Sequence, residues 1–482
     1  MSQPTKWSQF GTLITVFFFW GFVAASNDIL IPVFKKAFNL SQAQSQLVSV
    51  AFYVAYTVGS LIYFGISKLI GNDVLNKIGY KNGIVLGLII SAIGTLLFYP
   101  AANNASFTLM ITGLFIVGLG FSLQQIAANP LAIVIGDPKT GSQRLNMGGG
   151  VNNFGTTIGP LIVSFAIFGS VSSGSTEASI ESVKTPYLIL GLAFILVAIY
   201  FKFSSVPNKI DLEEVANDEA ESKEKVLHRP SPFSYPQLVL GMIAIFVYVG
   251  VEVSTASNLP EYMKQHLNID TANIAPFVSL YWASLMMGRW TGAVGAFDVS
   301  AGAKKILNFL MPYLAFGVFL TVNAIAQHDI SMFYVYGLVI IVMIAGDIMS
   351  KGSPARMLLI FSSLGIVALV IGMLTTGMVS VFAFTSVGLF CSTLWPCIFT
   401  LGVAGLGKHT NQGSSLLIMM IMGGGLISYA QGVVASDEIL GIQYSYIVGV
   451  ICFAYMAFYA VKAKSILKAQ GIDYDVKVSG GH

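Results

Sequence analysis

The chain has 482 residues, of which 55% are hydrophobic and only 10% are charged, and its mean hydropathy is +0.76. Soluble domains carry about 25% charged residues, so this composition excludes a soluble enzyme and predicts an all-α polytopic protein embedded in a lipid bilayer. The formal net charge of +3 says little by itself, because the placement of Lys and Arg in a membrane protein matters more than their sum.

The first 204 residues contain apolar stretches that are long enough for six membrane-spanning helices. A bilayer crossing needs about 20 mostly apolar residues. The candidate spans lie near residues 10–38, 45–70, 83–102, 108–136, 145–170 and 186–204. We therefore expect an N-terminal six-helix bundle over 1–204.

A polar stretch from Ser205 to Ser231 interrupts this pattern. Its acidic and basic residues leave too little apolar area for independent folding, so we expect a solvated linker over 205–233. A C-terminal bundle over 234–482 follows, with eight further spans near residues 235–258, 274–297, 304–326, 332–350, 355–375, 378–404, 412–434 and 441–463. The sequence thus predicts fourteen transmembrane helices in all.

Basic residues are distributed unevenly between the two sides of these spans. Most of them fall in turns and tails on the side of the membrane where the N-terminus lies. The turns on the opposite side of the membrane hold only Lys35, Lys36, Lys184 and Lys264. Cytoplasmic loops of membrane proteins carry an excess of Lys and Arg. We therefore expect both termini and the linker to lie in the cytoplasm.

The first span contains polar residues where a membrane helix is normally apolar. Asn27 and Asp28 lie inside it, and Pro32 follows four residues after the aspartate. A carboxylate at the centre of a membrane helix costs about 2.5–3.5 kcal/mol, and Pro32 removes a backbone donor and favours a kink. These features indicate a solute or ion site, with the other helices arranged around the first one.

A second carboxylate, Glu252, lies at membrane depth in the first span after the linker, in the place that Asp28 occupies in the first half. Steps of three residues from Glu252 reach Thr255 and Asn258, so a polar stripe could face a cavity. The alternative is a structural ion pair between Glu252 and Arg289. Both interpretations remain open at this point.

Asp347 also lies in an apolar run, but it stands only four residues before Lys351, at the end of a span. We expect a solvated carboxylate there and leave Asp347 outside the site.

Neutral amides interrupt the fourth and fifth spans. Gln125 and Asn129 are four residues apart and share a helix face, and Asn146, Asn152 and Asn153 lie in the next span. Amides offer donors and acceptors to hydroxyl groups, although they can also link helices to one another. With nearby aromatic side chains they favour a neutral sugar, which has a hydroxyl edge and an apolar face. The aromatic candidates are Tyr53, Tyr56, Tyr281, Trp282 and Trp395.

The two halves of the chain echo each other. Gly148-Gly149-Gly150 in the first half matches Gly423-Gly424-Gly425 in the second, and a similar polar turn precedes each triplet. Both triplets lie within spans and lack the Lys-Ser/Thr of a phosphate loop, so they indicate close helix packing. Matching halves suit a transporter whose site lies between them, and chance similarity in a glycine-rich chain is the alternative.

The sequence has no HExxH motif and no nucleophile elbow. Cys391, Cys397 and Cys452 lie in apolar runs without zinc-site spacing. We therefore expect no metal site, no cofactor, no nucleic-acid partner and no enzymatic activity. The linker is too short for an ATPase domain, so transport must use an ion gradient or run downhill.

Several motifs, taken in order, are similar to one known family. They are Asn27-Asp28-Ile29-Leu30-Ile31-Pro32, Ala127-Ala128-Asn129-Pro130, Arg144-Leu145-Asn146, Tyr248-Val249-Gly250 with Glu252, Gly288-Arg289, and Gly413-Ser414-Ser415 followed by the second glycine triplet. Over nearly its whole length the chain resembles the fucose–galactose–glucose:cation symporters of the major facilitator superfamily. The resemblance implies a major facilitator fold of two pseudo-symmetric six-helix bundles, a sugar site at the midplane and alternating access.

The resemblance also implies roles for particular residues. The family's first-helix aspartate, implicated in proton coupling, matches Asp28. Proton–fucose members have a glutamate at the position of Gln125 and a glutamine at that of Glu252, and both departures resemble the glucose/galactose branch. Similar animal relatives are sodium-coupled, so the coupling ion is expected to be H+ or Na+. The expected sugar ligands are Asn27, Gln125, Asn129, Asn152, Glu252 and Asn258.

The chain has two more predicted spans than the twelve of this family. We interpret the spans near 304–326 and 332–350 as an inserted helix pair, about 302–352, packed outside the transport core. The resemblance then implies a monomeric bacterial inner-membrane transporter that takes up a neutral monosaccharide, glucose or galactose, together with H+ or Na+. The alternatives are a downhill sugar facilitator and a membrane receptor that binds sugar without moving it.

Overall fold

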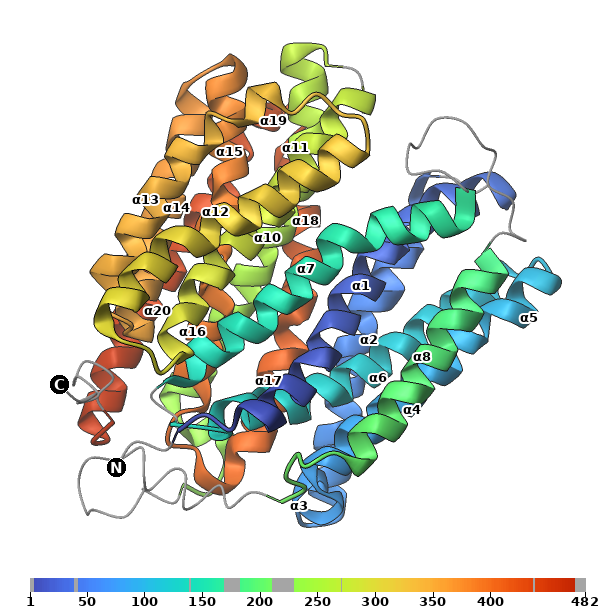
Figure 1. Cartoon of the computed structure of the whole chain (residues 1–482), viewed down its shortest axis with the longest axis vertical. Helices are drawn as coiled ribbons and strands as arrows, with labels where there is room; N and C mark the ends of the chain where they lie inside the picture. The colour runs from blue at the N-terminus through green and yellow to red at the C-terminus, as the bar shows by residue number, and fades with distance from the viewer. Residues whose placement is uncertain are drawn as a thin grey trace.

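The computed structural model describes residues 4–38, 42–137, 140–168, 183–209, 229–269, 271–436 and 438–472; the side chains at 25–37, 42–49, 160–161, 163–168 and 271–273 are outside this description. Every regular element in the described ranges is a helix (Figure 1). Twelve of the described segments are long and apolar enough to cross a membrane. The protein is therefore an all-helical, multi-pass membrane protein.

The described residues up to 209 are called here the N-terminal half. Its helices are α1 (Trp7–Ala37), α2 (Gln42–Leu69), α3 (Val74–Ile78), α4 (Tyr80–Leu96), α5 (Phe98–Asn103), α6 (Phe107–Val134), α7 (Gly141–Phe168) and α8 (Lys184–Phe203). Short polar side chains set some of the helix starts. Ser106 Oγ, for example, accepts a hydrogen bond from the Leu109 amide at the start of α6.

The described residues from 229 onward are called the C-terminal half. Its longer helices are α10 (Pro236–Leu267), α11 (Thr271–Ala293), α12 (Ala301–Ile325), α13 (Tyr336–Ser350), α14 (Pro354–Leu374), α15 (Gly377–Cys391), α16 (Leu394–Val403), α17 (Thr410–Met419), α18 (Gly423–Val434) and α20 (Ile447–Ala469). Shorter elements are η3 (Pro232–Ser234), η4 (Val294–Ala296), η5 (Ser331–Phe333), η6 (Gly407–His409), η7 (Met420–Met422) and α19 (Gly441–Tyr444).

Two spans of the C-terminal half are interrupted. Buried Ser392 and Thr393 separate α15 from α16, and the 3-10 turn η7 separates α17 from α18. Irregular backbone at membrane depth is tolerated only where it is buried in protein or lines a cavity. These breaks therefore mark the interior of the molecule.

Corresponding helix pairs are packed in the two halves. In the N-terminal half α1 packs on α7, α2 on α6, and α4 on both α6 and α8. In the C-terminal half α10 packs on α18, α11 on α15, and α14 on both α15 and α20. The helix α12 packs mainly on α11, and α13 contacts α12, α14 and α15.

The two halves meet at the end of the molecule that carries α3. Figure 1 has α3 at the bottom of the view, and we call this the α3 end. There α2 and α6 contact α17, while α7 contacts α11 and α16; we call this contact surface the seam. Ser415 Oγ donates across it to the Ser60 carbonyl (3.0 Å), and Ser414 Oγ donates to the Ile126 carbonyl (3.1 Å). The structure is therefore closed at the α3 end.

A fully buried arginine fixes the turn between α6 and α7. Arg144 Nε donates to the Ala132 carbonyl (2.8 Å), and its Nη2 donates to the carbonyls of Asp137 (2.7 Å) and Ile133. The last carbonyls of a helix have no partner within that helix. The guanidinium supplies donors to these groups at the end of α6, and its charge is favourable there.

The hydropathy spans agree with the observed helices to within a few residues at most ends. The largest difference is α10, which was expected to end near 258 and continues to Leu267. Its last turns carry Glu261 and Lys264, so the helix extends beyond the apolar run. The helices α7 and α11, which are 28 and 23 residues long, are not among the twelve candidate spans found within the described residues.

Candidate functional site

The centre of the candidate site is Glu252, close to the middle of the 32-residue α10. Tyr248, one turn earlier on the same helix, donates its hydroxyl to Glu252 Oε1 at 2.7 Å. Tyr281 of α11 donates to the backbone carbonyl of Glu252 at 2.8 Å. The glutamate side chain remains 12% exposed. Two tyrosines thus fix the position of the carboxylate without covering it.

Arg289 of α11 is the charged partner of this glutamate. The Arg289 Nη2 atom lies 3.8 Å from Glu252 Oε1, and the Tyr248 hydroxyl accepts from the same Nη2 at 3.5 Å. The ion pair between Glu252 and Arg289, given above as the structural alternative for Glu252, is therefore present. At 3.8 Å the pair is looser than a direct charge-assisted hydrogen bond, which spans about 2.7–2.9 Å.

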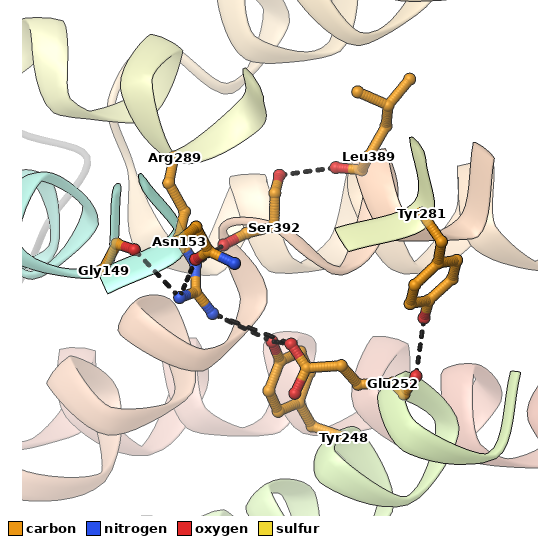
Figure 2. A network of polar contacts seen from close by, with 8 residues as sticks. All are labelled: Gly149, Asn153, Tyr248, Glu252, Tyr281, Arg289, Leu389 and Ser392. Atoms are coloured by element: carbon orange, nitrogen blue, oxygen red, sulfur yellow. Dashed lines mark hydrogen bonds and ion pairs between the residues drawn. The ribbon is translucent and has the colours of Figure 1, made fainter. Parts of the chain in front are cut away.

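Arg289 also joins the two halves of the protein (Figure 2). Its Nη1 donates to Asn153 Oδ1 at 2.6 Å and to the Gly149 carbonyl at 3.3 Å, both on α7. Its Nε donates to the Ser392 carbonyl at 3.0 Å, at the break between α15 and α16. A single guanidinium thus contacts three regions: the N-terminal half, the broken span and the carboxylate on α10.

The first glycine triplet makes this close approach possible. A Cβ at Gly149 would lie 2.9 Å from Arg289 Cδ, and a Cβ at Gly150 would lie 2.5 Å from Trp290 Cδ1. The Trp290 indole also donates to the Gly150 carbonyl at 3.2 Å. Gly149 and Gly150 therefore let Arg289 and Trp290 of α11 pack directly on the backbone of α7, which is the close helix packing expected from the sequence.

The predicted amides have different surroundings. Gln125 Nε2 donates to the Tyr56 hydroxyl at 3.2 Å, which brings together two of the predicted site residues. Asn152 Nδ2 donates to the Phe17 carbonyl at 3.1 Å and thereby links α7 to α1. Asn129 is fully buried, and neither of its side-chain polar atoms has a hydrogen-bond partner among the described residues. Their roles toward a sugar stay predictions.

For three other predicted positions the structure describes no contact with the rest of the candidate site. The side chains of Asn27 and Asp28 lie outside the described residues. Asn258 Nδ2 donates at 2.8 Å to the Ser254 carbonyl of its own helix, and no described contact joins it to Glu252. Thr255, the middle of the expected stripe, is fully buried.

The surroundings of Asp347 differ from the solvated helix end that we expected. Its Oδ2 accepts a 3.2 Å hydrogen bond from Asn308 Nδ2 of α12, and the pair is partly buried. The carboxylate therefore faces the neighbouring helix of the chain. The sequence did not predict this, because Asn308 is 39 residues away.

Sequence reasoning placed Asn153 with Asn152 among the amides of the fifth span, but it predicted neither the contact of Arg289 with α7 nor a role for Ser392. Ser392 contributes a backbone carbonyl, and Pro396, four residues later, has no N–H to donate to it. Within the described residues no group of three or more His, Cys, Asp or Glu side chains could hold a metal ion.

A second polar cluster lies at the seam, at the start of α3. Asp73 Oδ1 accepts hydrogen bonds from the Tyr63 hydroxyl (2.7 Å), from Asn411 Nδ2 (2.9 Å) and from the Leu75 amide (2.9 Å). The Tyr80 hydroxyl donates to Asn411 Oδ1 at 2.5 Å. Burial raises the pKa of Asp73 above its ordinary value of 3.8, although these hydrogen bonds partly oppose the rise.

The chain is similar to known membrane proteins over nearly its whole length. The Major Facilitator Superfamily profile matches residues 10–343. A glucose/galactose transporter of Brucella abortus is 32% identical over 462 residues, which is 95% of each protein. The L-fucose-proton symporter of Escherichia coli is 26% identical over 94% of this chain and 92% of its own.

A solved structure gives the same result for the fold. The superfamily transporter FucP, crystallised in the outward conformation, superposes with a TM-score of 0.70 at 25% identity, covering 94% of this chain and 98% of that one. The family resemblance indicated by the sequence motifs is confirmed. This chain belongs to the Major Facilitator Superfamily.

Proposed function

We propose that this protein is a secondary active transporter that takes up a neutral monosaccharide of the glucose/galactose class together with H+ or Na+. The names of its relatives, a glucose/galactose transporter and an L-fucose-proton symporter, support the substrate class and the coupling. The observation that carries the proposal is the partly exposed Glu252 carboxylate in mid-helix, adjacent to Arg289, whose hydrogen bonds join the two halves.

Glu252 has the chemistry needed to bind sugar hydroxyls. An ionised carboxylate only accepts hydrogen bonds, and a sugar hydroxyl is a donor. Tyr248 donates to one carboxylate oxygen, Oε1, and no hydrogen bond among the described residues reaches Oε2. Oε2 is therefore the atom that we assign to a substrate hydroxyl, with Gln125, Asn129 and Asn152 as the ligands proposed on the N-terminal half.

Asp28 is the proposed coupling residue. It would bind a proton or a sodium ion when the protein is open to the outside and release the ion on the cytoplasmic side. An acidic group inside a membrane helix is costly, and ion binding would neutralise that charge. The symporter named among the relatives favours the proton.

We also propose the membrane arrangement expected from the sequence: fourteen helices, in bundles over 1–204 and 234–482 joined by a cytoplasmic linker over 205–233. The repeated helix pairings support this arrangement, because α1, α2, α4, α6, α7 and α8 have counterparts in α10, α11, α14, α15, α18 and α20. Two further spans of the C-terminal half, α12 and α13, have no counterpart in the N-terminal half, which supports an inserted pair over about 302–352. The basic residues of the turns support cytoplasmic termini in a bacterial inner membrane.

The test is uptake by purified protein in liposomes. Labelled glucose, galactose, fucose and N-acetylglucosamine are offered with a proton gradient, a sodium gradient, both or neither. The proposal predicts accumulation of at least one of these sugars above its outside concentration, driven by one of the two gradients. Equilibration without accumulation under every gradient would identify a downhill facilitator, and binding without uptake would identify a receptor.

A further inference from the structure

Arg289 has acceptors on both halves: Asn153 and the Gly149 carbonyl on α7, and the Ser392 carbonyl and Tyr248 hydroxyl on the C-terminal half. Its shortest contact is with Asn153 of α7, at 2.6 Å, whereas Glu252 lies 3.8 Å away. Both charged side chains are only 12% exposed. The guanidinium therefore lies beside the carboxylate without binding it directly (Figure 2).

Opening of the seam would separate α7 from α11 and remove the Asn153 and Gly149 acceptors from Arg289. The Ser392 carbonyl and the Tyr248 hydroxyl would remain, but a partly buried cation that loses two of its acceptors is still destabilised. Glu252 is carried by the same half as Arg289, so it stays within reach when α7 moves away. A change of side-chain rotamer is enough to close a gap of 3.8 Å.

We propose that Arg289 transfers from Asn153 to Glu252 when the α3 end opens, and that this transfer displaces the sugar from Glu252. The inference rests on the proposed function and adds a release step to it. While the seam is closed, α7 holds the guanidinium and Oε2 of Glu252 is available to a sugar hydroxyl. When the seam is open, the guanidinium occupies the carboxylate and the sugar loses its acceptor.

Linkage makes this inference measurable. If opening of the seam weakens sugar binding, then sugar binding must oppose opening of the seam by the same factor. Bound sugar should therefore protect buried seam residues from chemical modification. Removal of Arg289 should abolish this protection, because nothing then displaces the sugar in the open state.

Ser415 is a suitable reporter of the seam. It is fully buried, and its hydroxyl donates across the seam to the Ser60 carbonyl. The substitution Ser415→Cys changes one atom and introduces a thiol on α17, away from Arg289. Cys391, Cys397 and Cys452, all buried, are replaced by alanine so that the new thiol is the only one. Its alkylation rate by N-ethylmaleimide then reports seam opening in the full-length protein.

In the parent protein we expect saturating sugar to lower the alkylation rate. In Asn153→Ala the basal rate should rise roughly tenfold, because one charge-assisted hydrogen bond across the seam is lost, while sugar still protects. In Arg289→Gln the basal rate should also rise, but protection by sugar should be lost. Arg289→Lys, which keeps the charge but not the fork of donors, should retain part of the protection.

Gly425→Ala is the matched control, since a Cβ at that position meets nothing within 4 Å; it should behave as the parent. Sugar binding is measured in parallel by equilibrium dialysis with labelled glucose and galactose. Equal protection in the parent and in Arg289→Gln, with sugar bound by both, would overturn the transfer but leave the proposed function intact. A parent that binds neither sugar would contradict the proposed function, and the transfer with it.

Discussion

The second glycine triplet contains a pair of positions that should respond oppositely to the same substitution. A Cβ at Gly423 would overlap the backbone carbonyl oxygen of Phe246 and lie 2.7 Å from its carbon and 2.9 Å from its Cα. A Cβ at Gly425, two residues later on α18, would meet no atom within 4 Å. The substitutions Gly423→Ala and Gly425→Ala therefore test one contact between α10 and α18.

The expected magnitudes follow from this geometry. Carbon atoms pack at about 3.5–4.0 Å, so Gly423→Ala would have to push α18 away from α10 by about 1 Å. Overpacking of this kind costs about 1–3 kcal/mol, and backbone atoms cannot move aside as a side chain can. Gly425→Ala should be neutral or stabilising by up to about 1 kcal/mol, because alanine is the better helix former.

The assay is thermal unfolding of the purified protein in detergent. The fraction of protein that remains monodisperse is measured after heating to each temperature, and the midpoint is the temperature at which half is lost. We expect a lower midpoint for Gly423→Ala, and a midpoint equal to or above that of the parent for Gly425→Ala. In the first triplet, Gly148→Ala should be milder than Gly423→Ala, because its Cβ meets the Phe17 ring, which can rotate. Equal midpoints for Gly423→Ala and Gly425→Ala would refute the packing of α18 against α10 described above.

Three further predictions concern acidic residues. Asp28→Asn should abolish uphill accumulation while counterflow exchange of sugar survives, and unchanged gradient-driven uptake would exclude coupling at Asp28. Glu252→Gln should weaken sugar binding, because a neutral amide is a weaker acceptor than a carboxylate. Equilibrium dialysis measures the dissociation constant, and an unchanged value would mean that Glu252 serves only as the ion-pair partner of Arg289. Because burial raises the pKa of Asp73 above 3.8, its neutral form contributes stability that is complete below about pH 4 and lost as the pH rises through the raised pKa. The thermal midpoint should therefore fall less between pH 4 and pH 7 in Asp73→Asn than in the parent, and parallel profiles would show that Asp73 contributes nothing.

The helices could be predicted from the sequence because a bilayer imposes a simple rule of length and apolarity. The break before α16 has a signal in the sequence, because Pro396 has no N–H to donate to the Ser392 carbonyl four residues earlier. The break before α18 could not be predicted from hydropathy, because the Met420–Met422 turn lies in an apolar run. Hydropathy does not detect a local change in backbone conformation. Such breaks depend on which neighbouring side chains satisfy the freed carbonyls, as Arg289 does for Ser392.

The candidate site was predictable in its chemistry but not in its contacts. Glu252 is conspicuous in the sequence, because a carboxylate in an apolar span is costly. Its pairing with Arg289 could be proposed from charge alone. The hydrogen bond between Arg289 and Asn153 joins residues 136 positions apart on different halves, and no periodicity within a single helix predicts it.

Arg144 has a mechanical consequence for the transport cycle. By binding several carbonyls around the α6–α7 turn, it makes this part of the N-terminal half a stiff corner. The opposing surface of the seam, in contrast, contains the interrupted spans α15–α16 and α17–α18, where fewer backbone hydrogen bonds resist bending. Alternating access would then be unequal, with one half swinging as a block while the other flexes at two hinges. Spin labels placed on either side of η7 should change their separation during the cycle, whereas labels on either side of the α6–α7 corner should not.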